Sequence, residues 1–153
     1  MQRRMLRIHD AVSREEILQA RRLFEESLGI ARAGGFPDTG AVSLTWLGAH
    51  ATPPEYEDAD AYLDFALADV LPEAALLAEA ADVFLERGAF DAAQARRYLE
   101  ACRGHGLALR LHGDQFTEAG AIPLAIELGA RSVDHLEATG PEGITGLAAS
   151  DVV

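Results

Sequence analysis

Three histidines, His50, His112 and His135, each stand at the end of a short apolar run with strand-like composition. Neutral imidazole is a common metal ligand and a common proton carrier near neutral pH. One histidine at a strand end is more often a hydrogen-bonded structural residue, but three at one sheet edge favour a metal or acid–base site. His9, near the N-terminus, and His105, beside glycines after a helical pattern, are interpreted as solvated residues outside this set.

The segment His112-Gly113-Asp114-Gln115 is the densest cluster of candidate functional residues in the sequence. A glycine beside a histidine lets a ligand or a neighbouring backbone come close, and the Gln115 amide offers both a donor and an acceptor to a polar substrate. Asp114 has two interpretations of similar weight. It could orient His112 or His135 as a supporting carboxylate, or it could serve as a surface or capping residue.

Two further acids lie near predicted strand ends. Glu86 could face the same edge as the histidines, or it could pair with Arg87 or another surface arginine. Asp134 precedes His135 and could hold that part of the site in order, or it could belong to a strand-end turn. Dinucleotide-binding, P-loop, CxxC, HExxH and GxSxG motifs are all absent from the sequence.

Composition limits the possible partners and the size of the fold. The 153 residues are 49% hydrophobic, enough for one domain with a core. The net charge of −12 and the pI of about 4.7 argue against nucleic acid or an anionic membrane as a partner. The basic N-terminus is followed by no apolar signal region, and no stretch reaches the roughly 18 apolar residues of a membrane span. The single cysteine, Cys102, fits a reducing compartment, so we expect a cytoplasmic protein.

The elements that must position the histidines alternate between strands and helices. A first helix is predicted from Ser13, its N-cap, to a stop at Gly29, and turn residues follow over 34–40. Pro72 is expected either at a kink or in the first turn of a second helical piece that runs through Ala80. The predicted strands cover 42–47, 81–85, 107–111 and 131–133, and the later helices cover 60–71, 91–102, 118–128 and 141–150.

This alternation predicts an α/β fold with about four parallel strands, because parallel strands need crossover connections that helices provide. The three histidines would then meet at the carboxyl edge of the sheet, where α/β proteins bind ligands. We interpret residues 1–153 as a single domain with a tail over 1–12, a helix and loop over 13–40, and βα units over 41–153.

Four ordered motifs resemble imidazolonepropionase, a metal-dependent amidohydrolase of histidine degradation. Their residues are 47–51 with 53–56, 82–84 with 88–90, 111–115, and 127–130 with 134–137. The resemblance covers about Leu44 to Ser150. It implies hydrolysis of the small molecule 4-imidazolone-5-propionate to N-formimino-L-glutamate with a zinc or iron ion, which lowers the pKa of a water molecule toward neutrality.

The resemblance also implies roles for individual residues. His112 matches a metal ligand of the family, and His50 matches a histidine that contacts the substrate. His135 matches a histidine that binds or polarises the substrate and so counts as both a catalytic and a binding residue. Gln115 stands where the family has Glu or Gln, and it is expected to orient the substrate or water, because an amide cannot take up a proton.

The chain also departs from the family. The HxH pair of the first barrel strand and the aspartate ligand of the last strand have no match, so His112 alone remains of four expected metal ligands. A complete (β/α)8 barrel takes roughly 250 residues, so the sequence predicts a partial barrel from the middle of the enzyme. Two hypotheses follow: a piece of an imidazolonepropionase that is incomplete as an isolated chain, or an inactive half-barrel that associates with itself or with a complementary chain.

Overall fold

The computed structural model describes residues 44–153 together with Arg22, Glu26 and Gly34. Residues Leu44–Val153 form a compact unit, and the fold below is the fold of that unit. Apart from the three single residues, the predicted helix from Ser13 and the predicted turn over 34–40 lie outside the described residues. Within the described part of the chain, no helix has the length and apolar character needed to cross a membrane.

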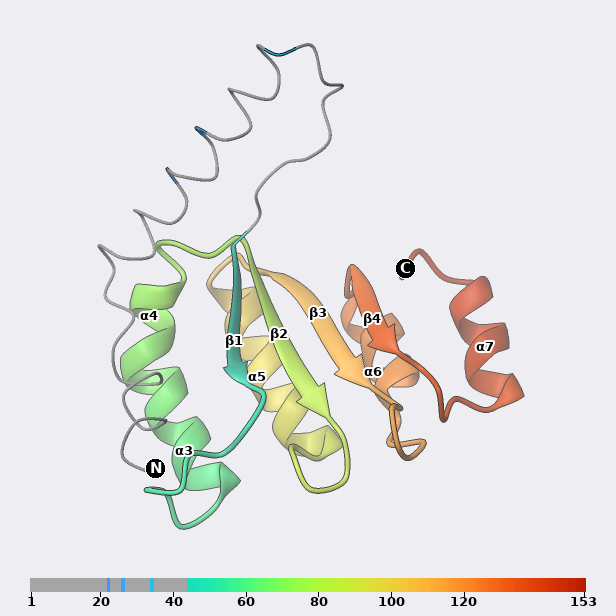
Figure 1. Cartoon of the computed structure of the whole chain (residues 1–153), viewed down its shortest axis with the longest axis horizontal. Helices are drawn as coiled ribbons and strands as arrows, with labels where there is room; N and C mark the ends of the chain where they lie inside the picture. The colour runs from blue at the N-terminus through green and yellow to red at the C-terminus, as the bar shows by residue number, and fades with distance from the viewer. Residues whose placement is uncertain (1–21, 23–25, 27–33, 35–43) are drawn as a thin grey trace. The chain divides into compact units, whose positions relative to one another are not determined.

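Four parallel strands alternate with helices, which confirms the α/β prediction (Figure 1). The strands are β1 (Thr45–Ala49), β2 (Ala80–Leu85), β3 (Ala108–Gly113) and β4 (Ser132–His135). The helices are α3 (Ala59–Phe65), the π-helical turn η1 (Ala66–Val70), α4 (Leu71–Ala74), α5 (Ala92–Gly104), α6 (Ala121–Leu128) and α7 (Pro141–Ala148).

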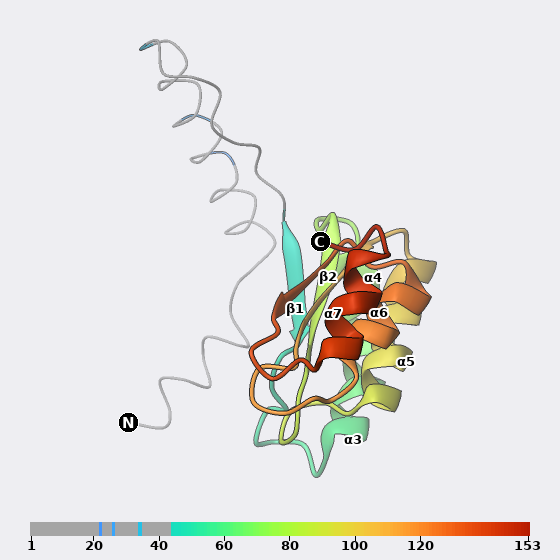
Figure 2. The ribbon, with the colours of Figure 1, turned by 90° about the vertical axis from the view of Figure 1, so that its right-hand side faces the viewer.

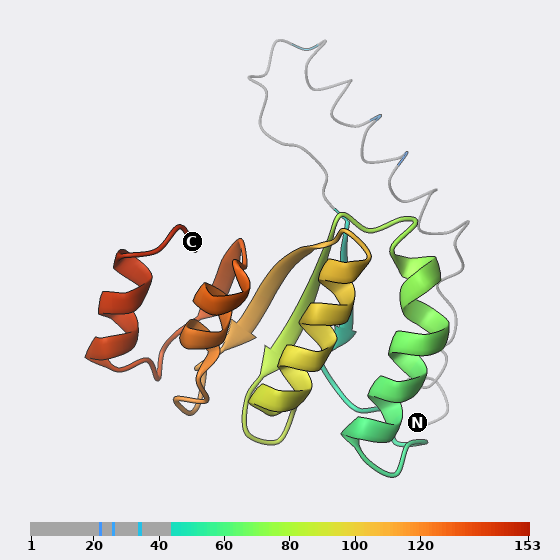
Figure 3. The same ribbon diagram turned by 180° about the vertical axis from the view of Figure 1, so that it is seen from behind.

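The strands lie in the sheet in their chain order, β1-β2-β3-β4, and every neighbouring pair is parallel. The helices of the unit all lie on one side of the sheet, as the edge-on view shows (Figure 2). Seen from behind, the same helices stand in front of the strands (Figure 3). Each new strand is therefore added on the same side of the previous one, without the reversal of strand order that marks a doubly wound sheet.

The two faces of the sheet differ in what they carry. Val83, Leu109 and Leu111 are buried among the core residues on the helix side. Strand residues alternate between faces, so Asp82 and His112 lie on the opposite face, which no helix of the unit covers. The pattern places apolar packing on one face and the polar groups of interest on the other.

The chain around Pro72 departs from the sequence prediction in one respect. Pro72 stands in the first turn of the short helix α4, as one of the two alternatives expected, but α4 ends at Ala74 instead of continuing through Ala80. The backbone N–H groups of Glu79 and Ala80 both donate to the Leu44 carbonyl oxygen, so this stretch is drawn into the sheet beside β1. Sheet pairing therefore overrides the helical pattern before β2.

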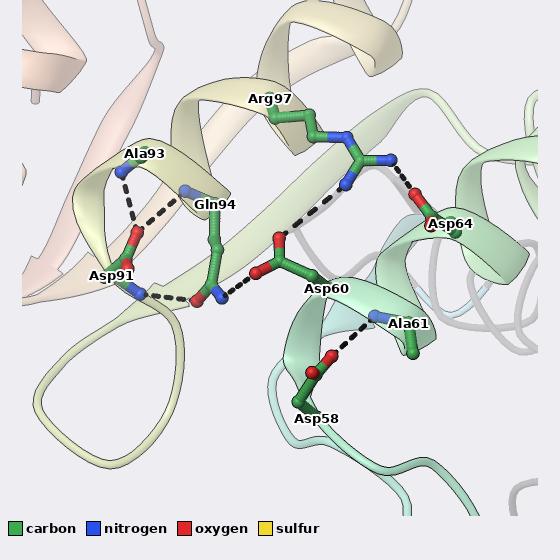
Figure 4. A network of polar contacts seen from close by, with 8 residues as sticks. All are labelled: Asp58, Asp60, Ala61, Asp64, Asp91, Ala93, Gln94 and Arg97. Atoms are coloured by element: carbon green, nitrogen blue, oxygen red, sulfur yellow. Dashed lines mark hydrogen bonds and ion pairs between the residues drawn. The ribbon is translucent and has the colours of Figure 1, made fainter.

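The start of α5 shows how a local sequence signal fixes an element. The Asp91 side chain accepts hydrogen bonds from the backbone of Ala93 and Gln94, and the Gln94 side chain accepts one from the Asp91 N–H, a complete capping box (Figure 4). Gln94 and Arg97 also reach acidic residues of α3 (Figure 4). These exposed contacts tie the two helices together but add little stability.

The edge of β4 is partly occupied by the last residue of the chain. The Val153 N–H donates to the Arg131 carbonyl oxygen, and the Val133 N–H donates to the Val153 carbonyl oxygen. This pair of hydrogen bonds, on either side of Ser132, is the pattern of a parallel bridge. Helix α7 thus returns the chain to the sheet beside β4.

Candidate functional site at the carboxyl end of the sheet

The three histidines predicted to converge do so. His50 directly follows β1, His112 lies in β3, and His135 is the last residue of β4. The ring centroids of His50 and His112 are 5.0 Å apart, and those of His112 and His135 are 5.2 Å apart. The side chains are partly exposed, so all three rings border solvent at one edge of the sheet.

A buried aspartate from β2 joins two of the histidines. Asp82 is 2% exposed, and its Oδ1 atom lies 2.8 Å from His112 Nδ1 and 3.1 Å from His50 Nε2. Asp82 is not among the site residues predicted from the sequence, because it lies in mid-strand and not at a strand end. A signal was present nonetheless: Asp82 is the one charged residue in the otherwise apolar strand β2, and a charge buried in a strand needs a partner.

His50, Asp82 and His112 form a group whose ligand atoms all lie within 4.8 Å of one another. Two imidazoles and a carboxylate are donors that suit zinc or iron, so the chemistry of the group fits the metal that the resemblance implies. His112, the single candidate ligand predicted from the sequence, thus has two further potential donors beside it. Its role as a metal ligand and the role of His50 in substrate contact stay predictions.

Gln115 and His135 flank this group without bonding to it. Gln115 is half-buried in the loop after β3, and its side chain makes no hydrogen bond within the described residues. The His135 Nδ1 atom lies 3.7 Å from a carboxylate oxygen of Glu137, a contact between partly exposed groups. Both side chains are thus free of strong restraints, and their predicted roles toward a substrate stay predictions.

Glu86 does not pair with the Arg87 side chain or with a histidine; its carboxylate holds the loop that carries Gln115. It is 3% exposed and accepts hydrogen bonds from the backbone N–H groups of Arg87, Phe116 and Thr117, and from the Thr117 hydroxyl. Burial raises the pKa of this carboxyl, but the hydrogen bonds outweigh burial and bring the pKa to about 2. The carboxylate is therefore a structural anion beneath the site.

Of the two interpretations of Asp114, the structure selects the capping role. The side chain is 1% exposed and accepts hydrogen bonds from the N–H groups of Ala119 and Ala121 and from the Thr139 hydroxyl. Helix α6 begins at Ala121 and not near the predicted residue 118, because the backbone of Gly120 is left-handed (φ 88°); Asp114 accepts from the first N–H of the helix. Asp114 contacts neither histidine through a hydrogen bond.

The backbone at the site adopts conformations that side chains seldom take. Asp114 has φ 49°, and the consecutive residues His135 and Leu136 have φ 82° and 71°. Left-handed backbone at residues other than glycine costs energy and concentrates at binding and catalytic sites. Backbone hydrogen bonds from Leu136 to the Gly113 carbonyl and from Ala138 to the Asp114 carbonyl hold this strained turn.

Comparison with known proteins gives the site a context. No family model matches the chain. The imidazolonepropionase of Rubrobacter xylanophilus is 63% identical over 119 residues, which make up 78% of this chain and 29% of that protein. Those of Chloroflexus aggregans and Shewanella frigidimarina are 50% and 49% identical, over 71% of this chain and 28% and 27% of their own lengths.

The chain spans less than a third of the length of these relatives. Identity of 44–63% over more than two thirds of this chain is nevertheless far above chance. It also agrees with the four motifs identified in the sequence and with the parallel βα arrangement of this unit. Over this shared segment, the chain is homologous to the imidazolonepropionases.

Proposed function

We propose that the chain provides the central βα units of an imidazolonepropionase and takes part in the hydrolysis of 4-imidazolone-5-propionate to N-formimino-L-glutamate in the cytoplasm. The observation that carries this proposal is the convergence of His50, Asp82, His112 and His135 at the carboxyl end of parallel strands, in a chain homologous to that enzyme. In the partial (β/α)8 barrel that we propose, this edge is where the active site lies.

The reaction breaks the bond between the ring carbonyl carbon and a ring nitrogen. A water oxygen joins the carbon, one water proton passes to the nitrogen, and the ring opens. A divalent zinc or iron ion, held by His112 together with ligands outside this chain, would lower the pKa of that water. His50 follows β1, and the half-buried Gln115 lies in the loop that directly follows His112 and the end of β3. Both residues are proposed to orient the ring.

His135 is the residue we propose for moving the proton. Histidine is the side chain that most often serves as a general acid or base, because an imidazole can both accept and donate a proton. Its ring stands 5.2 Å from that of His112 and is partly exposed, so a substrate bound at His112 would be within its reach. Gln115 cannot take that role, because an amide neither gains nor loses a proton in this range.

The direct test combines this chain with the parts of the Rubrobacter relative that lie before and after the matched segment. The full chain is produced alone and together with those parts, supplied with zinc, and given 4-imidazolone-5-propionate; mass spectrometry measures the product that has gained one water. We expect turnover in the combined protein, loss to background with His112→Ala, and no change with His105→Ala, whose exposed side chain follows α5 away from the site.

One observation favours the second candidate, an inactive half-barrel that associates. No helix of the unit covers the sheet face that carries Asp82 and His112. A combined protein that assembles stoichiometrically and binds zinc but forms no product would contradict the enzymatic proposal and leave association as the function. Turnover that depends on His112 and His135 would contradict the inactive half-barrel.

A further inference from the structure

One carboxylate oxygen lies between two histidines and meets them through different ring nitrogens. Asp82 Oδ1 contacts Nδ1 of His112 at 2.8 Å and Nε2 of His50 at 3.1 Å. Both distances lie within the range of N–H···O hydrogen bonds. Asp82 is almost fully buried, whereas the two rings are about 30% exposed, so the carboxylate lies beneath the rings and the rings border solvent.

The chemistry of a carboxylate decides which nitrogens carry protons. An ionised carboxylate can only accept, so each nitrogen that faces Asp82 must carry its hydrogen. In a neutral imidazole the other nitrogen then has the lone pair. His112 would be protonated on Nδ1 with Nε2 free, and His50 would be protonated on Nε2 with Nδ1 free.

We propose that Asp82 is a positioning residue that fixes His50 and His112 in opposite tautomers and presents one lone pair of each ring to the reaction centre. The proposal deepens the proposed function and rests on it. Nitrogens that donate a proton to Asp82 are not ligands, so Nε2 of His112 is the nitrogen available for the metal. Nδ1 of His50 is the nitrogen available as an acceptor for an N–H group of the substrate ring.

A carboxylate that holds a metal-binding histidine in this way also raises the basicity of the ring and fixes its orientation. Loss of such a partner costs about 10–100-fold in metal affinity, whereas loss of a ligand removes binding almost entirely. The two roles for Asp82, positioning residue or direct ligand, therefore predict different measurements.

The first measurement needs neither metal nor substrate. Nitrogen-15 NMR of the full metal-free chain, at a pH of about 8 where unperturbed imidazole is neutral, distinguishes protonated from unprotonated ring nitrogens for His50 and His112. We expect Nδ1–H for His112 and Nε2–H for His50. The same tautomer in both rings, or Nε2–H in His112, would overturn the proposal, and no variant is required for that result.

Variants then test the cause. In Asp82→Ala we expect His112 of the metal-free chain to lose its fixed Nδ1–H signal, and the zinc affinity of the combined protein described above to fall by about 10–100-fold. Asp82→Asn, which keeps an acceptor oxygen, should retain part of both. Asp134→Asn is the matched control, since Asp134 faces His112 in the register of β3 and β4 but bonds to neither ring. It should leave the tautomers unchanged.

Cobalt substitution separates the two roles. If Asp82 is a ligand, Asp82→Ala abolishes cobalt binding or changes its visible spectrum, and the positioning role is overturned. If cobalt binds more weakly with an unchanged spectrum, the positioning role stands. Because the tautomers are read without turnover, failure of the imidazolonepropionase activity would leave this result intact, and failure of the tautomer prediction would leave the activity test intact.

Discussion

Two buried carboxylates beside the site, Glu86 and Asp114, hold backbone N–H groups and thereby shape the loops that carry the functional side chains. Glu86 bonds to the loop after β3, and Asp114 bonds to the start of α6 and to Thr139. Hydrogen bonds to a charged acceptor are stronger than neutral ones, and a buried donor left without its acceptor costs the full desolvation penalty. Glu86 and Asp114 therefore stabilise the loops around the site. The side chains of His112 and His135 are instead partly exposed to solvent.

Glu86 gives the protein a pH-dependent stability term whose sign follows from its pKa. The folded pKa of about 2 lies below the ordinary 4.5, so the stabilisation is fully present above about pH 4.5 and is lost as the pH falls toward 2. We expect Glu86→Gln to unfold at a lower urea concentration than the parent near pH 7, with a difference that shrinks below pH 4.5. Urea titrations across this range test it, and a difference that stays constant down to pH 2 would contradict the assignment.

Asp114 provides a second test at this scale. Asp114→Ala removes the acceptor of three hydrogen bonds from a fully buried position, so we expect a loss of about 1–3 kcal/mol in the free energy of unfolding. Asp114→Asn should lose less, because asparagine keeps an acceptor oxygen and tolerates the left-handed backbone at φ 49°. Equal losses in the two variants, measured by chemical denaturation, would show that the hydrogen bonds do not carry the effect.

At the scale of elements, the contact between β3 and α6 depends on the absence of one side chain. A Cβ atom built on Gly113 would lie 2.3 Å from Ala121 Cβ and 3.2 Å from the Leu85 carbonyl oxygen. From the sequence, this glycine was expected to admit a ligand or a neighbouring backbone; the neighbour is Ala121, the first residue of α6. The close approach of helix and strand fixes the loop that lies between His112 and α6.

Gly113→Ala should therefore force strand and helix apart, at a cost of about 1–3 kcal/mol in unfolding free energy. Gly104→Ala is the control, because a Cβ at Gly104 meets nothing within 4 Å and alanine favours the helix end. Ala121→Gly in the Gly113→Ala background should recover part of the loss. The test is to measure the unfolding free energy of the parent, the two single variants and the double variant by thermal or urea unfolding. A Gly113→Ala variant as stable as the parent would contradict the close contact.

Periodicity and capping signals predict local elements well, and they predict the site only where it coincides with strand ends. The capping box at Asp91 and the three histidines after strand-like runs could be found in this way. Asp82 could not, because its partners lie 30 and 32 residues away and meet it only through strand register. The hydrogen bonds of Glu86 to the loop at Phe116 and Thr117 were hidden for the same reason.

At the scale of the whole molecule, charge opposes the association that the uncovered sheet face would favour. The net charge of −12 repels a second copy, while the face carrying Asp82 and His112 offers surface that no helix of the unit buries. Arg110 lies on this same face, and its Nε atom is buried without a hydrogen-bond partner among the described residues. We infer that any homo-oligomer is weak at low ionic strength.

Salt should therefore promote self-association. Added NaCl shortens the screening length from about 30 Å at 0.01 M to about 10 Å at 0.1 M, so repulsion between like-charged copies falls. We expect the average mass of the full chain in sedimentation equilibrium to rise with ionic strength over this range. An average mass that stays at the monomer value throughout, or that falls with salt, would contradict self-association through the sheet face that carries Asp82 and His112.

The bridge between Val153 and Ser132 means that a polypeptide fused after Val153 would begin alongside the edge of β4. Because the N–H and carbonyl of Val153 already bond on either side of Ser132, residues joined after Val153 start in parallel register with β4. They also start on the side away from β3, so the sheet would grow by one more strand in the same winding sense. Fusion junctions at Val153 should therefore preserve strand geometry without a linker, whereas a rigid helical fusion there would have to break these two hydrogen bonds.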